Sequence, residues 1–303
     1  MKKIFQDVEL VLSVIVLNFN GLKFLKTCLD SLYEFIDVPF EIIFVDNQSS
    51  DESADFVASN YSGVKVVISP ENGGFSKGNN LGVSEASGQY LLILNNDTIL
   101  QSPVSGGITI LDEVSSVGVV GAKMLSSTGA YRQSACNFPG IVGAMLFAKN
   151  FVSNAPFDSG DFNTCAEEYH IVDWVEASFS IVRRSDFLNI GGYNENHFMY
   201  AEDMDFCYRM RLQGLHTVYF PQAQYVHFGG FNSTRYEMLV EGYSDFFRDN
   251  YKPLHGFLCN TALFFGLAIK VLACHISYLF RQEGNIKIKL ASYSKALKMV
   301  RWT

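Results

Sequence analysis

Residues 11–21 read Val-Leu-Ser-Val-Ile-Val-Leu-Asn-Phe-Asn-Gly. The run 11–17 is almost continuously aliphatic, which is typical of a strand buried on both faces of a parallel sheet. A helical stripe of leucines follows within 21–35. Further strands are predicted over 41–45, 64–68 and 90–94, and further helices over 77–86 and up to about 60, the latter capped by Ser50 or Asp51. This alternation predicts an α/β fold with a mostly parallel sheet and right-handed crossovers.

Each of these strands is followed by a polar cluster. The clusters are Asn18-Phe19-Asn20-Gly21, Asp46-Asn47, Asn72-Gly73-Gly74 and Asn95-Asn96-Asp97. Ligands of open α/β sheets bind beyond the carboxyl ends of the strands, so the clusters predict a site along one edge. Asp46 is expected to contact a ribose or base, and Asp97 to ligate Mg²⁺ or Mn²⁺. A capping turn at Asp46 and a plain turn at Asp97 explain these residues equally well.

The segment 72–80 is rich in glycine and leads into a predicted helix. Such loops let backbone N–H groups approach a phosphate, with help from the helix N-terminus. The segment has neither the G-x-G-x-x-G nor the Walker A spacing, so it is not a generic dinucleotide or P-loop site. A tight turn is an equally good interpretation.

Residues 195–209, Glu-Asn-His-Phe-Met-Tyr-Ala-Glu-Asp-Met-Asp-Phe-Cys-Tyr-Arg, interleave three carboxylates with large apolar side chains. Burial raises a carboxylate's pKa and lets it act as a base, so at least one of Glu202, Asp203 and Asp205 is expected to lie in a partly buried cleft and to serve in proton transfer. Acidic residues that favour a helix N-terminus are the alternative, but they do not explain the apolar lead-in. Asp205 and Arg209 are predicted to form a structural pair at helical spacing.

His227 is flanked by apolar residues in Tyr-Val-His-Phe-Gly-Gly. A lone histidine there is more often structural than a ligand. The acidic elements favour the ligand interpretation, because His and Asp together suit Mn²⁺ or Mg²⁺ sites that also hold a diphosphate.

The rest of the chain is less regular. The middle, 103–170, is expected to be an irregular insertion that faces the substrate. Beyond it, strands are predicted over 174–182, 215–220 and 223–228, and helices over 184–189 and 202–213.

Composition narrows the class of protein. The chain has 303 residues and is 48% hydrophobic, which is ample for a core, and its net charge of −8 argues against nucleic-acid binding. The six cysteines contain no C-x-x-C pair and are interpreted as reduced core residues of a cytosolic protein. The N-terminus is interrupted by charges, which argues against a signal peptide.

The C-terminal part differs in character. Residues 257–280 are long and apolar enough to span a bilayer, although Lys270 would cost about 2.5–3.5 kcal/mol on insertion scales. Residues 281–303 carry a net charge of +5. Binding in the plane of an anionic membrane surface is preferred, a full span ranks second and a helix packed on the domain third. The predicted division is a catalytic domain over 1–250 and a helical, membrane-associated tail over 251–303.

In these motifs the chain resembles glycosyltransferase family 2, inverting enzymes with the GT-A fold, and most closely the rhamnosyltransferase-like bacterial branch. The matching pieces keep the family order over about 11–235. They are Val16–Gly21, 45–51, 72–80, Leu94-Asn95-Asn96-Asp97-Thr98, Val182-Arg183-Arg184 and 191–230.

The resemblance implies a role for each matching position. Asp46 and the Asn18 region would bind the nucleotide, and Asp203 would be the catalytic base beside Glu202. Asp97 matches the last, metal-binding acid of the family's D-x-D element, whose first acid is here Asn95. The remaining implied positions are Asn72, Lys77, Asn80 and Asn96 at the nucleotide sugar and His227 at a Mg²⁺ or Mn²⁺ ion.

The same resemblance implies the reaction and its partners. A sugar, rhamnose among the candidates, would pass from a nucleoside-diphosphate donor to a hydroxyl of a saccharide or polyprenyl-diphosphate-linked acceptor in cell-surface polysaccharide synthesis. The enzyme would be cytoplasmic, peripheral on or anchored to the inner membrane. A UDP-hexose transferase of the same family is the main alternative.

Two other classes fit less well. A nucleotidyltransferase would carry a basic G-x-G-x-R-like loop after the first strand, where this chain has Asn18-Phe19-Asn20-Gly21. A non-catalytic, membrane-docked binder of sugar nucleotides would not need Asp97, Asp203 and His227 together.

Overall fold

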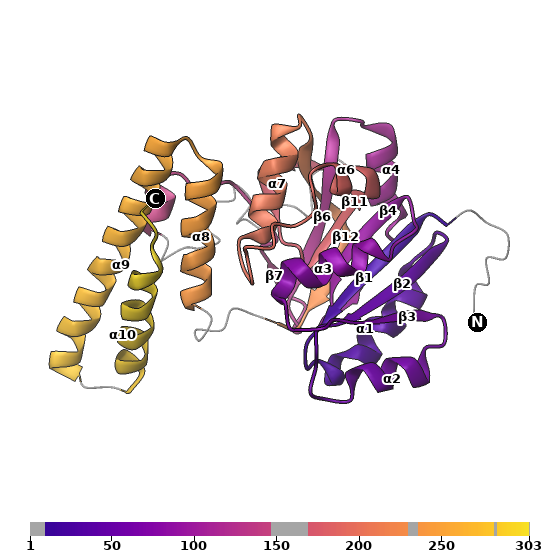
Figure 1. Cartoon of the computed structure of the whole chain (residues 1–303), viewed down its shortest axis with the longest axis horizontal. Helices are drawn as coiled ribbons and strands as arrows, with labels where there is room; N and C mark the ends of the chain where they lie inside the picture. The colour runs from indigo at the N-terminus through magenta and orange to yellow at the C-terminus, as the bar shows by residue number, and fades with distance from the viewer. Residues whose placement is uncertain (1–9, 147–168, 230–235, 282–283, 303) are drawn as a thin grey trace.

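The computed structural model describes residues 10–146, 169–229, 236–281 and 284–302. An α/β part lies beside a C-terminal group of helices (Figure 1). The strands are β1 (Leu12–Asn18), β2 (Phe40–Asp46), β3 (Val64–Ile68), β4 (Tyr90–Asn95), β5 (Thr98–Leu100), β6 (Val117–Leu125), β7 (Tyr131–Arg132), β8 (Ala135–Cys136), β9 (His170–Val172), β10 (Trp174–Val175), β11 (Phe179–Arg183) and β12 (His216–His227). The helices are α1 (Leu22–Phe35), α2 (Ser53–Asn60), α3 (Gly74–Ser84), α4 (Ser105–Glu113), α5 (Ile141–Leu146), α6 (Arg184–Asn189), α7 (Glu202–Leu212), α8 (Tyr236–Asn250), α9 (Pro253–Arg281), α10 (Gly284–Ala296) and the 3-10 turn η3 (Leu297–Met299).

The main sheet runs in the order β3-β2-β1-β4-β11-β6-β12-β5, with β7 beside β6 and β9 beside β12. β1 is parallel to β2 and β4, and β2 is parallel to β3, which confirms the predicted parallel first half. β11 joins this half antiparallel to β4 and β6. Asn18 lies opposite Asp46 in the register, so the polar ends of β1 and β2 lie side by side.

Helices cover both faces of the sheet. Val14 and Val16 of β1 pack in one buried cluster with side chains of α1, α2 and α4, and Ile15 packs in another with α3, α6 and α7. Every residue of β1 except Leu17 is buried, which explains why the strand is apolar at consecutive positions. The predicted fold class, a mostly parallel sheet between helices with an apolar C-terminal helix, is confirmed.

The expectation of an irregular middle segment is wrong over 105–125. This part forms α4 and β6, and β6 is a buried strand of the main sheet between β11 and β12. Gly118 and Gly121 interrupt the apolar pattern by which this strand could be predicted from the sequence. A Cβ on Gly121 would lie 2.5 Å from a methyl of Val175. Glycine is thus needed for packing here. Residues 147–168 of the predicted insertion lie outside the described residues.

Three local predictions also need correction. The strand predicted over 174–182 is two strands, because the chain leaves β10, which pairs with β8, and joins the main sheet as β11. The strands predicted over 215–220 and 223–228 are one strand, β12, with an irregularity between Phe220 and Gln224 where Pro221 lacks a ladder N–H. The N-cap of α2 is Glu52, and Asp51 Oδ1 instead accepts the Ser53 N–H at 3.2 Å.

The cysteines in the described residues are free thiols, and four of these five are buried. This agrees with their interpretation as reduced core residues. Cys165 and the N-terminal residues 1–9 lie outside the described part of the chain.

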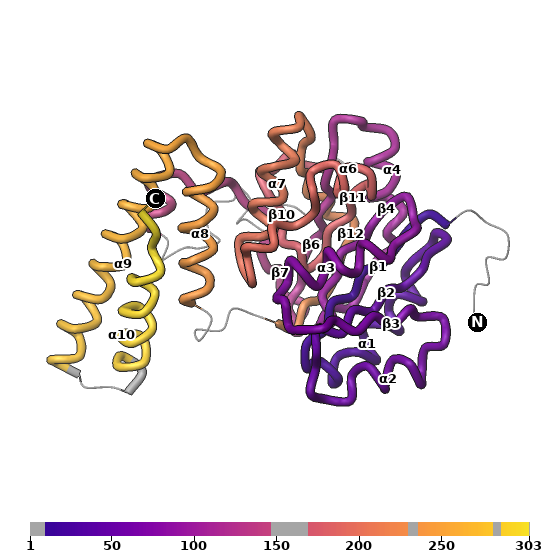
Figure 2. Tube along the Cα trace, viewed as in Figure 1, coloured from indigo at the N-terminus to yellow at the C-terminus, as the bar shows by residue number. Residues whose placement is uncertain are grey.

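The C-terminal helices form a layer of their own. α8, α9 and α10 lie side by side, and α5 packs against α9 (Figure 2). The predicted tail therefore corresponds to α9, α10 and η3, which rest on α8 from the predicted catalytic domain. The division at 250 stays a prediction.

Candidate active site

Asn18, Asp46 and Asn96 meet at the carboxyl edge of the sheet. Asn18 Nδ2 donates to Asp46 Oδ1 at 3.2 Å and to Ser49 Oγ at 3.0 Å, and Asn96 Nδ2 donates to Asn18 Oδ1. A Cβ on Gly21 would lie 1.8 Å from Asn96 Nδ2, so glycine is required beside this network. The structure thus brings the predicted nucleotide-binding residues of three different segments together.

The glycine-rich segment is held by Asn47, a residue of the second polar cluster to which the sequence gave no role of its own. Buried Asn47 donates from Nδ2 to Asn72 Oδ1 at 2.9 Å and to the Gly74 carbonyl at 3.0 Å. The Phe75 N–H donates to the Phe198 carbonyl at 2.7 Å, and a Cβ on Gly74 would lie 2.1 Å from that carbonyl oxygen. The glycine therefore lets this loop pack closely against the segment that leads to the candidate base.

The other two predicted donor-site residues of this segment have partners within the protein. Lys77 Nζ pairs with Glu71 Oε1 at 3.2 Å on the surface. Asn80 donates from Nδ2 to the Tyr193 carbonyl at 2.9 Å and to Glu195 Oε1 at 3.0 Å, and its Oδ1 accepts the Tyr193 N–H at 2.9 Å. Asn80, on α3, thus holds the segment around Tyr193 and Glu195 that leads to Asp203. Its predicted contact with the donor stays a prediction.

Asp97 and His227 come together as predicted. β5 and β12 pair so that His227 lies opposite Thr98, and His227 Nε2 is 3.1 Å from Asp97 Oδ1. Burial would raise the pKa of Asp97, but the hydrogen bond and charge of His227 outweigh it and hold that pKa below its usual value. A Cβ on Gly229 would lie 2.4 Å from Asp97 Oδ2, so only glycine leaves room above the pair.

The donor set of this pair suits a divalent cation that is shared with a phosphate. One carboxylate and one imidazole are acceptable Mn²⁺ or Mg²⁺ ligands, and His227 Nδ1 is buried without a partner in the described structure. Within the described residues, no group of three or more His, Cys, Asp or Glu side chains could hold an ion. The remaining ligands would have to come from phosphate oxygens and water.

Glu202 and Asp203 stand in the first turn of α7. The helix starts after Tyr200 and Ala201, whose positive φ values of 75° and 68° mark strain of the kind found at functional sites. Burial and the neighbouring Asp203 charge raise the pKa of Glu202 well above its usual value. Burial, with the charge of Glu176, raises the pKa of Asp203 to about 7. A carboxylate with a pKa near 7 has the proton affinity that a general base needs at neutral pH, and Asp203 stays the predicted base.

The loop between β10 and β11 connects this base to the strand end that bears Asp97. The Ala177 N–H points at Asp203 Oδ2 across 3.5 Å, and the Asn95 N–H donates to the Ser178 carbonyl at 3.2 Å. Glu176 in the same loop was missed, because the sequence predicted an uninterrupted strand there. Burial raises the pKa of Glu176, and the charges of His227 and Arg132 partly offset this effect.

Arg132 is a second residue that the sequence did not reveal. Its Nη1 donates to the His227 carbonyl at 3.3 Å and also to the Gly229 carbonyl. Arg132 thus holds the end of β12 in place behind the Asp97–His227 pair. No motif in the sequence pointed to this arginine.

Asp205 and Arg209 form the predicted structural pair. Arg209 Nε is 2.7 Å from Asp205 Oδ2, and its other nitrogens donate to the carbonyls of Ile190 at 2.9 Å and Gly192 at 2.8 Å. Asn250 Nδ2 also donates to Asp205 Oδ1 at 2.8 Å, which joins α8 to α7. The pair therefore anchors the helix that carries Asp203.

Arg209→Met is expected to lower the free energy of unfolding by about 3–5 kcal/mol, because it leaves the buried Asp205 charge without its cation. Denaturant unfolding measures this loss. Arg211→Met is the matched control, because its pair with Asp173 is solvent-exposed and is expected to contribute about 0–1 kcal/mol. Equal losses in the two variants would contradict the anchoring role.

The chain is similar to known glycosyltransferases in sequence and in fold. A sequence model described as glycosyl transferase family 2 matches residues 13–106. The low-salt glycan biosynthesis hexosyltransferase Agl10 of Haloferax volcanii is 24% identical over 241 residues, 78% of this chain and 73% of that protein. The N-acetylglucosaminyl-diphospho-decaprenol L-rhamnosyltransferase of Mycobacterium tuberculosis is 25% identical over 238 residues, 72% of this chain and 76% of that protein.

Solved structures share the fold across almost the whole chain. S. aureus TarS 1-349 in complex with UDP has a TM-score of 0.54 at 20% identity and covers 92% of this chain and 75% of its own. The mannosyltransferase PcManGT from Pyrobaculum calidifontis in complex with GDP-Man and Mn²⁺ has a TM-score of 0.56 at 13% identity, over 97% of this chain and 86% of its own. The chain spans 49% of a longer TarS structure. Residues 13–106 thus match the family 2 glycosyltransferase model, the chain is similar over most of its length to proteins named as hexosyl- and rhamnosyltransferases, and its architecture is GT-A-like.

Proposed function

We propose that the protein transfers a single sugar from a nucleoside-diphosphate sugar to a hydroxyl of a saccharide or polyprenyl-diphosphate-linked acceptor, with inversion at the anomeric carbon. The single observation that carries the proposal is Asp203, whose pKa is raised to about 7 and which is tied through the 176–178 loop to the edge that bears Asp97. A carboxylate with such a pKa accepts a hydroxyl proton efficiently at neutral pH.

In this proposal the network of Asn18, Asp46 and Asn96 binds the nucleoside. Asp203 takes the proton of the acceptor hydroxyl as that oxygen attacks the anomeric carbon from the face opposite the diphosphate. The new C–O bond forms as the bond to the nucleoside diphosphate breaks, so a single displacement inverts the configuration. Burial and the charge of Glu176 keep the pKa of Asp203 high, and the charge of Asp203 in turn raises the pKa of buried Glu202.

Asp97 and His227 would hold a Mg²⁺ or Mn²⁺ ion. When bound, such an ion neutralises charge on the diphosphate and makes it a better leaving group. PcManGT, which shares the fold, was solved with GDP-Man and Mn²⁺. The pair itself links the end of β12 to β5.

The names of the relatives support a choice of donor and acceptor for this proposal. The mycobacterial relative is named as an L-rhamnosyltransferase that acts on a diphospho-decaprenol-linked sugar, and the archaeal relative is named as a hexosyltransferase. We therefore put deoxythymidine-diphosphate rhamnose first and a UDP-hexose second. The role is the synthesis of a cell-surface polysaccharide, with the enzyme at the cytoplasmic face of the inner membrane.

Binding and turnover of candidate donors test the proposal. A donor that binds only the folded state raises the melting temperature, so UDP-, GDP- and dTDP-sugars are compared with and without Mn²⁺. One of them should give a metal-dependent shift and transfer its sugar to a polyprenyl-diphosphate sugar, with an inverted anomeric configuration by NMR. Binding without transfer to any acceptor would favour the non-catalytic sugar-nucleotide binder.

The pH dependence of the reaction offers a separate prediction. Since Asp203 is active as a carboxylate, kcat should fall as pH falls through about 7 and level off above it. Glu176→Gln removes one of the charges that raise the pKa of Asp203, so the whole profile should shift to lower pH. Burial, the larger cause, remains and limits the shift. An unchanged profile in this variant would contradict the coupling of the two carboxyls.

A further inference from the structure

The longest helix of the protein exposes an apolar stripe that the catalytic proposal does not use. The stripe consists of Leu258, Phe265, Ile269, Leu272, Ile276 and Leu279, which recur at steps of three, four or seven residues along α9. Their exposed fractions range from 40% to 76%. Residues at these steps share one face of a helix, so the stripe is continuous over about 32 Å. It contains no charged side chain.

A second helix widens this apolar surface. α5 packs against α9 where Gly266 replaces a side chain, since a Cβ there would lie 2.0 Å from the Met145 carbonyl oxygen. Val142, Met145 and Leu146 of α5 are themselves exposed. Exposed apolar surface of this extent marks an interaction site.

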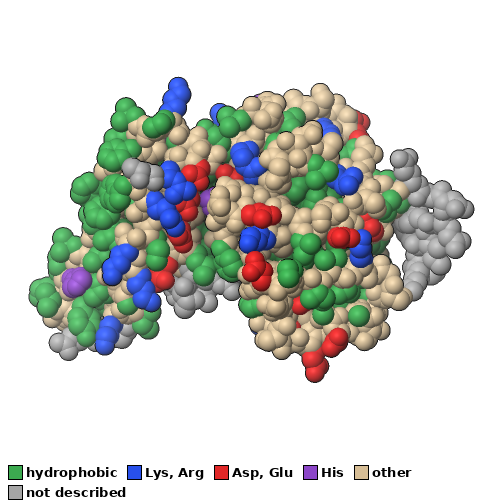
Figure 3. All heavy atoms as spheres, viewed as in Figure 1, with side chains coloured by type: hydrophobic (Ala, Val, Ile, Leu, Met, Phe, Trp, Pro, Cys, Tyr) green, Lys and Arg blue, Asp and Glu red, His purple; other side chains and the backbone are tan. Residues whose placement is uncertain are grey.

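The charges beside the stripe are basic. Lys287, Lys289, Lys295 and Lys298 are exposed on α10 and η3, and Figure 3 shows Lys and Arg side chains over this region next to the apolar margin formed by α9. A symmetric dimer through this surface would place the lysines of the two copies close together, and their like charges would repel. An anionic lipid surface instead complements both the apolar stripe and its basic flank.

The opposite face of α9 is committed to protein. Lys270 places Nζ 4.7 Å from the ring centroid of Tyr293 on α10. Cys259, Leu263 and Leu267 are fully buried. α9 therefore cannot cross a bilayer without α10, and the lysines of α10 exclude that helix from the hydrocarbon.

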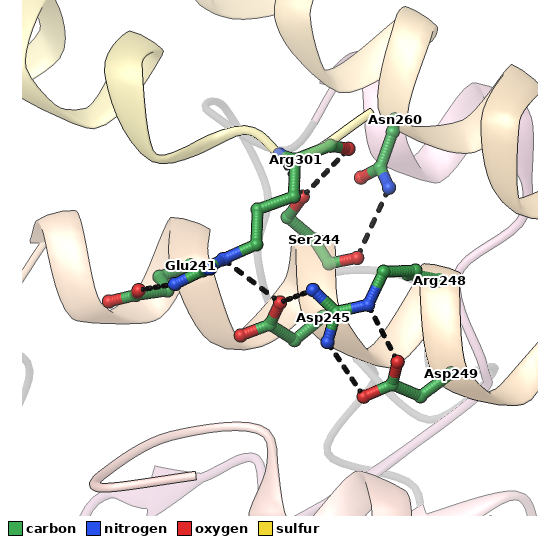
Figure 4. Close-up of polar contacts among 7 residues, drawn as sticks. All are labelled: Glu241, Ser244, Asp245, Arg248, Asp249, Asn260 and Arg301. Atoms are coloured by element: carbon green, nitrogen blue, oxygen red, sulfur yellow. Dashed lines mark hydrogen bonds and ion pairs between the residues drawn. The ribbon is translucent and has the colours of Figure 1, made fainter. Parts of the chain in front are cut away.

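A cluster of polar contacts links α8 to α9 and to the segment after η3 (Figure 4). Arg301, just after η3, donates its N–H to Ser244 Oγ at 2.7 Å, and its guanidinium pairs with Asp245 at 3.2 Å and with Glu241. Asn260 Nδ2 of α9 donates to the carbonyl of the same Ser244 at 3.1 Å. These contacts fasten α9 and the segment after η3 to α8.

We infer that α9 lies in the plane of the membrane surface, with its 258–279 stripe among the lipid acyl chains and the lysines of α10 on anionic headgroups. The inference rests on the proposed function for its purpose, which is to hold the enzyme where a polyprenyl-linked acceptor is embedded. α9 is long and apolar enough to span a bilayer. The in-plane orientation is favoured because one side of α9 packs on α10, whose lysines would have to enter the hydrocarbon if α9 crossed it.

Flotation of the full chain with vesicles tests this orientation. Vesicles of phosphatidylcholine containing about one third phosphatidylglycerol are compared with phosphatidylcholine alone. The wild type should float with the anionic vesicles and be released by alkaline carbonate. Leu272→Glu/Ile276→Glu should reduce binding by more than about tenfold, because each buried aliphatic side chain contributes about that factor. Lys287→Glu/Lys289→Glu should reduce binding to anionic vesicles only.

Leu188→Glu, at an equally exposed apolar position on α6, is the matched control and should float like the wild type. Melting temperature and donor-induced shifts in every variant show that the fold and the donor site are intact, which separates failure here from failure of the proposed function. Three results would overturn the inference: equal flotation of the stripe variant, resistance of the wild type to carbonate, or a lipid-free dimer that the stripe substitutions dissociate.

Discussion

Replacing Asp203 with asparagine is expected to lower kcat by about 10²–10⁴-fold and to leave donor affinity nearly unchanged. Asparagine keeps the size of the side chain, so the first turn of α7 and the approach of the Ala177 N–H should persist. It removes the group that accepts the hydroxyl proton. Steady-state kinetics with an excess of acceptor measure the loss, and calorimetric titration of the donor measures the affinity.

Glu202→Gln is the variant to compare with Asp203→Asn. Glu202 is only 6% exposed and has an unpartnered Oε2 within the described structure, whereas Asp203 is partly open. The loss of kcat should therefore be much larger for Asp203→Asn than for Glu202→Gln. A reversed order would transfer the base role to Glu202. Loss of nucleotide affinity in Asp203→Asn would show that the residue binds the donor and is not the base.

Replacing Asp97 with asparagine is expected to weaken Mn²⁺-dependent donor binding by about 100-fold or more. Loss of partners outside the ligand shell already weakens metal sites by about 10–100-fold, so loss of a ligand should reach or exceed the upper end of that range. The amide that replaces the carboxylate can still hydrogen-bond His227, so the pairing of β5 with β12 should survive. Donor titration with Mn²⁺ and with a chelator gives the comparison.

The chelator is the control for this second variant. Without the metal, wild type and Asp97→Asn should bind the donor equally weakly, and His227→Gln should follow the same pattern. If Asp97→Asn weakens binding equally with and without Mn²⁺, then Asp97 acts directly on the donor. A wild type whose donor affinity ignores the chelator would contradict metal dependence altogether.

The local sequence was sufficient for the first half of the fold. β1, β2 and β4 have consecutive apolar residues because both faces of a central parallel strand are buried, and this burial is visible in the chain itself. The polar residues after each strand meet at one edge because parallel strands end on the same side. For the same reason, the meeting of Asn18 with Asp46 followed from the order of the segments.

Other residues were placed only by tertiary structure. β6 carries glycines where Val175 needs room, so its periodicity is weak and its position in the sheet depends on long-range pairing. Glu176 interrupts an apolar run, and its role arises from the approach of Asp203 across the 176–178 loop. The role of Arg132 likewise depends on its hydrogen bonds to the carbonyls of His227, at the end of β12, and Gly229.

The sequence by itself determined that the chain is an α/β protein with acidic groups at the carboxyl edge of its sheet and an apolar, basic C-terminal part. Tertiary structure alone decided which carboxyl is raised to a pKa of about 7 and which face of α9 is free. The physical reason is the same in both cases. Burial of a central strand requires apolar side chains at consecutive positions, which the sequence shows directly. The pKa of a carboxyl and the exposure of a helix face instead depend on neighbours far away in the chain.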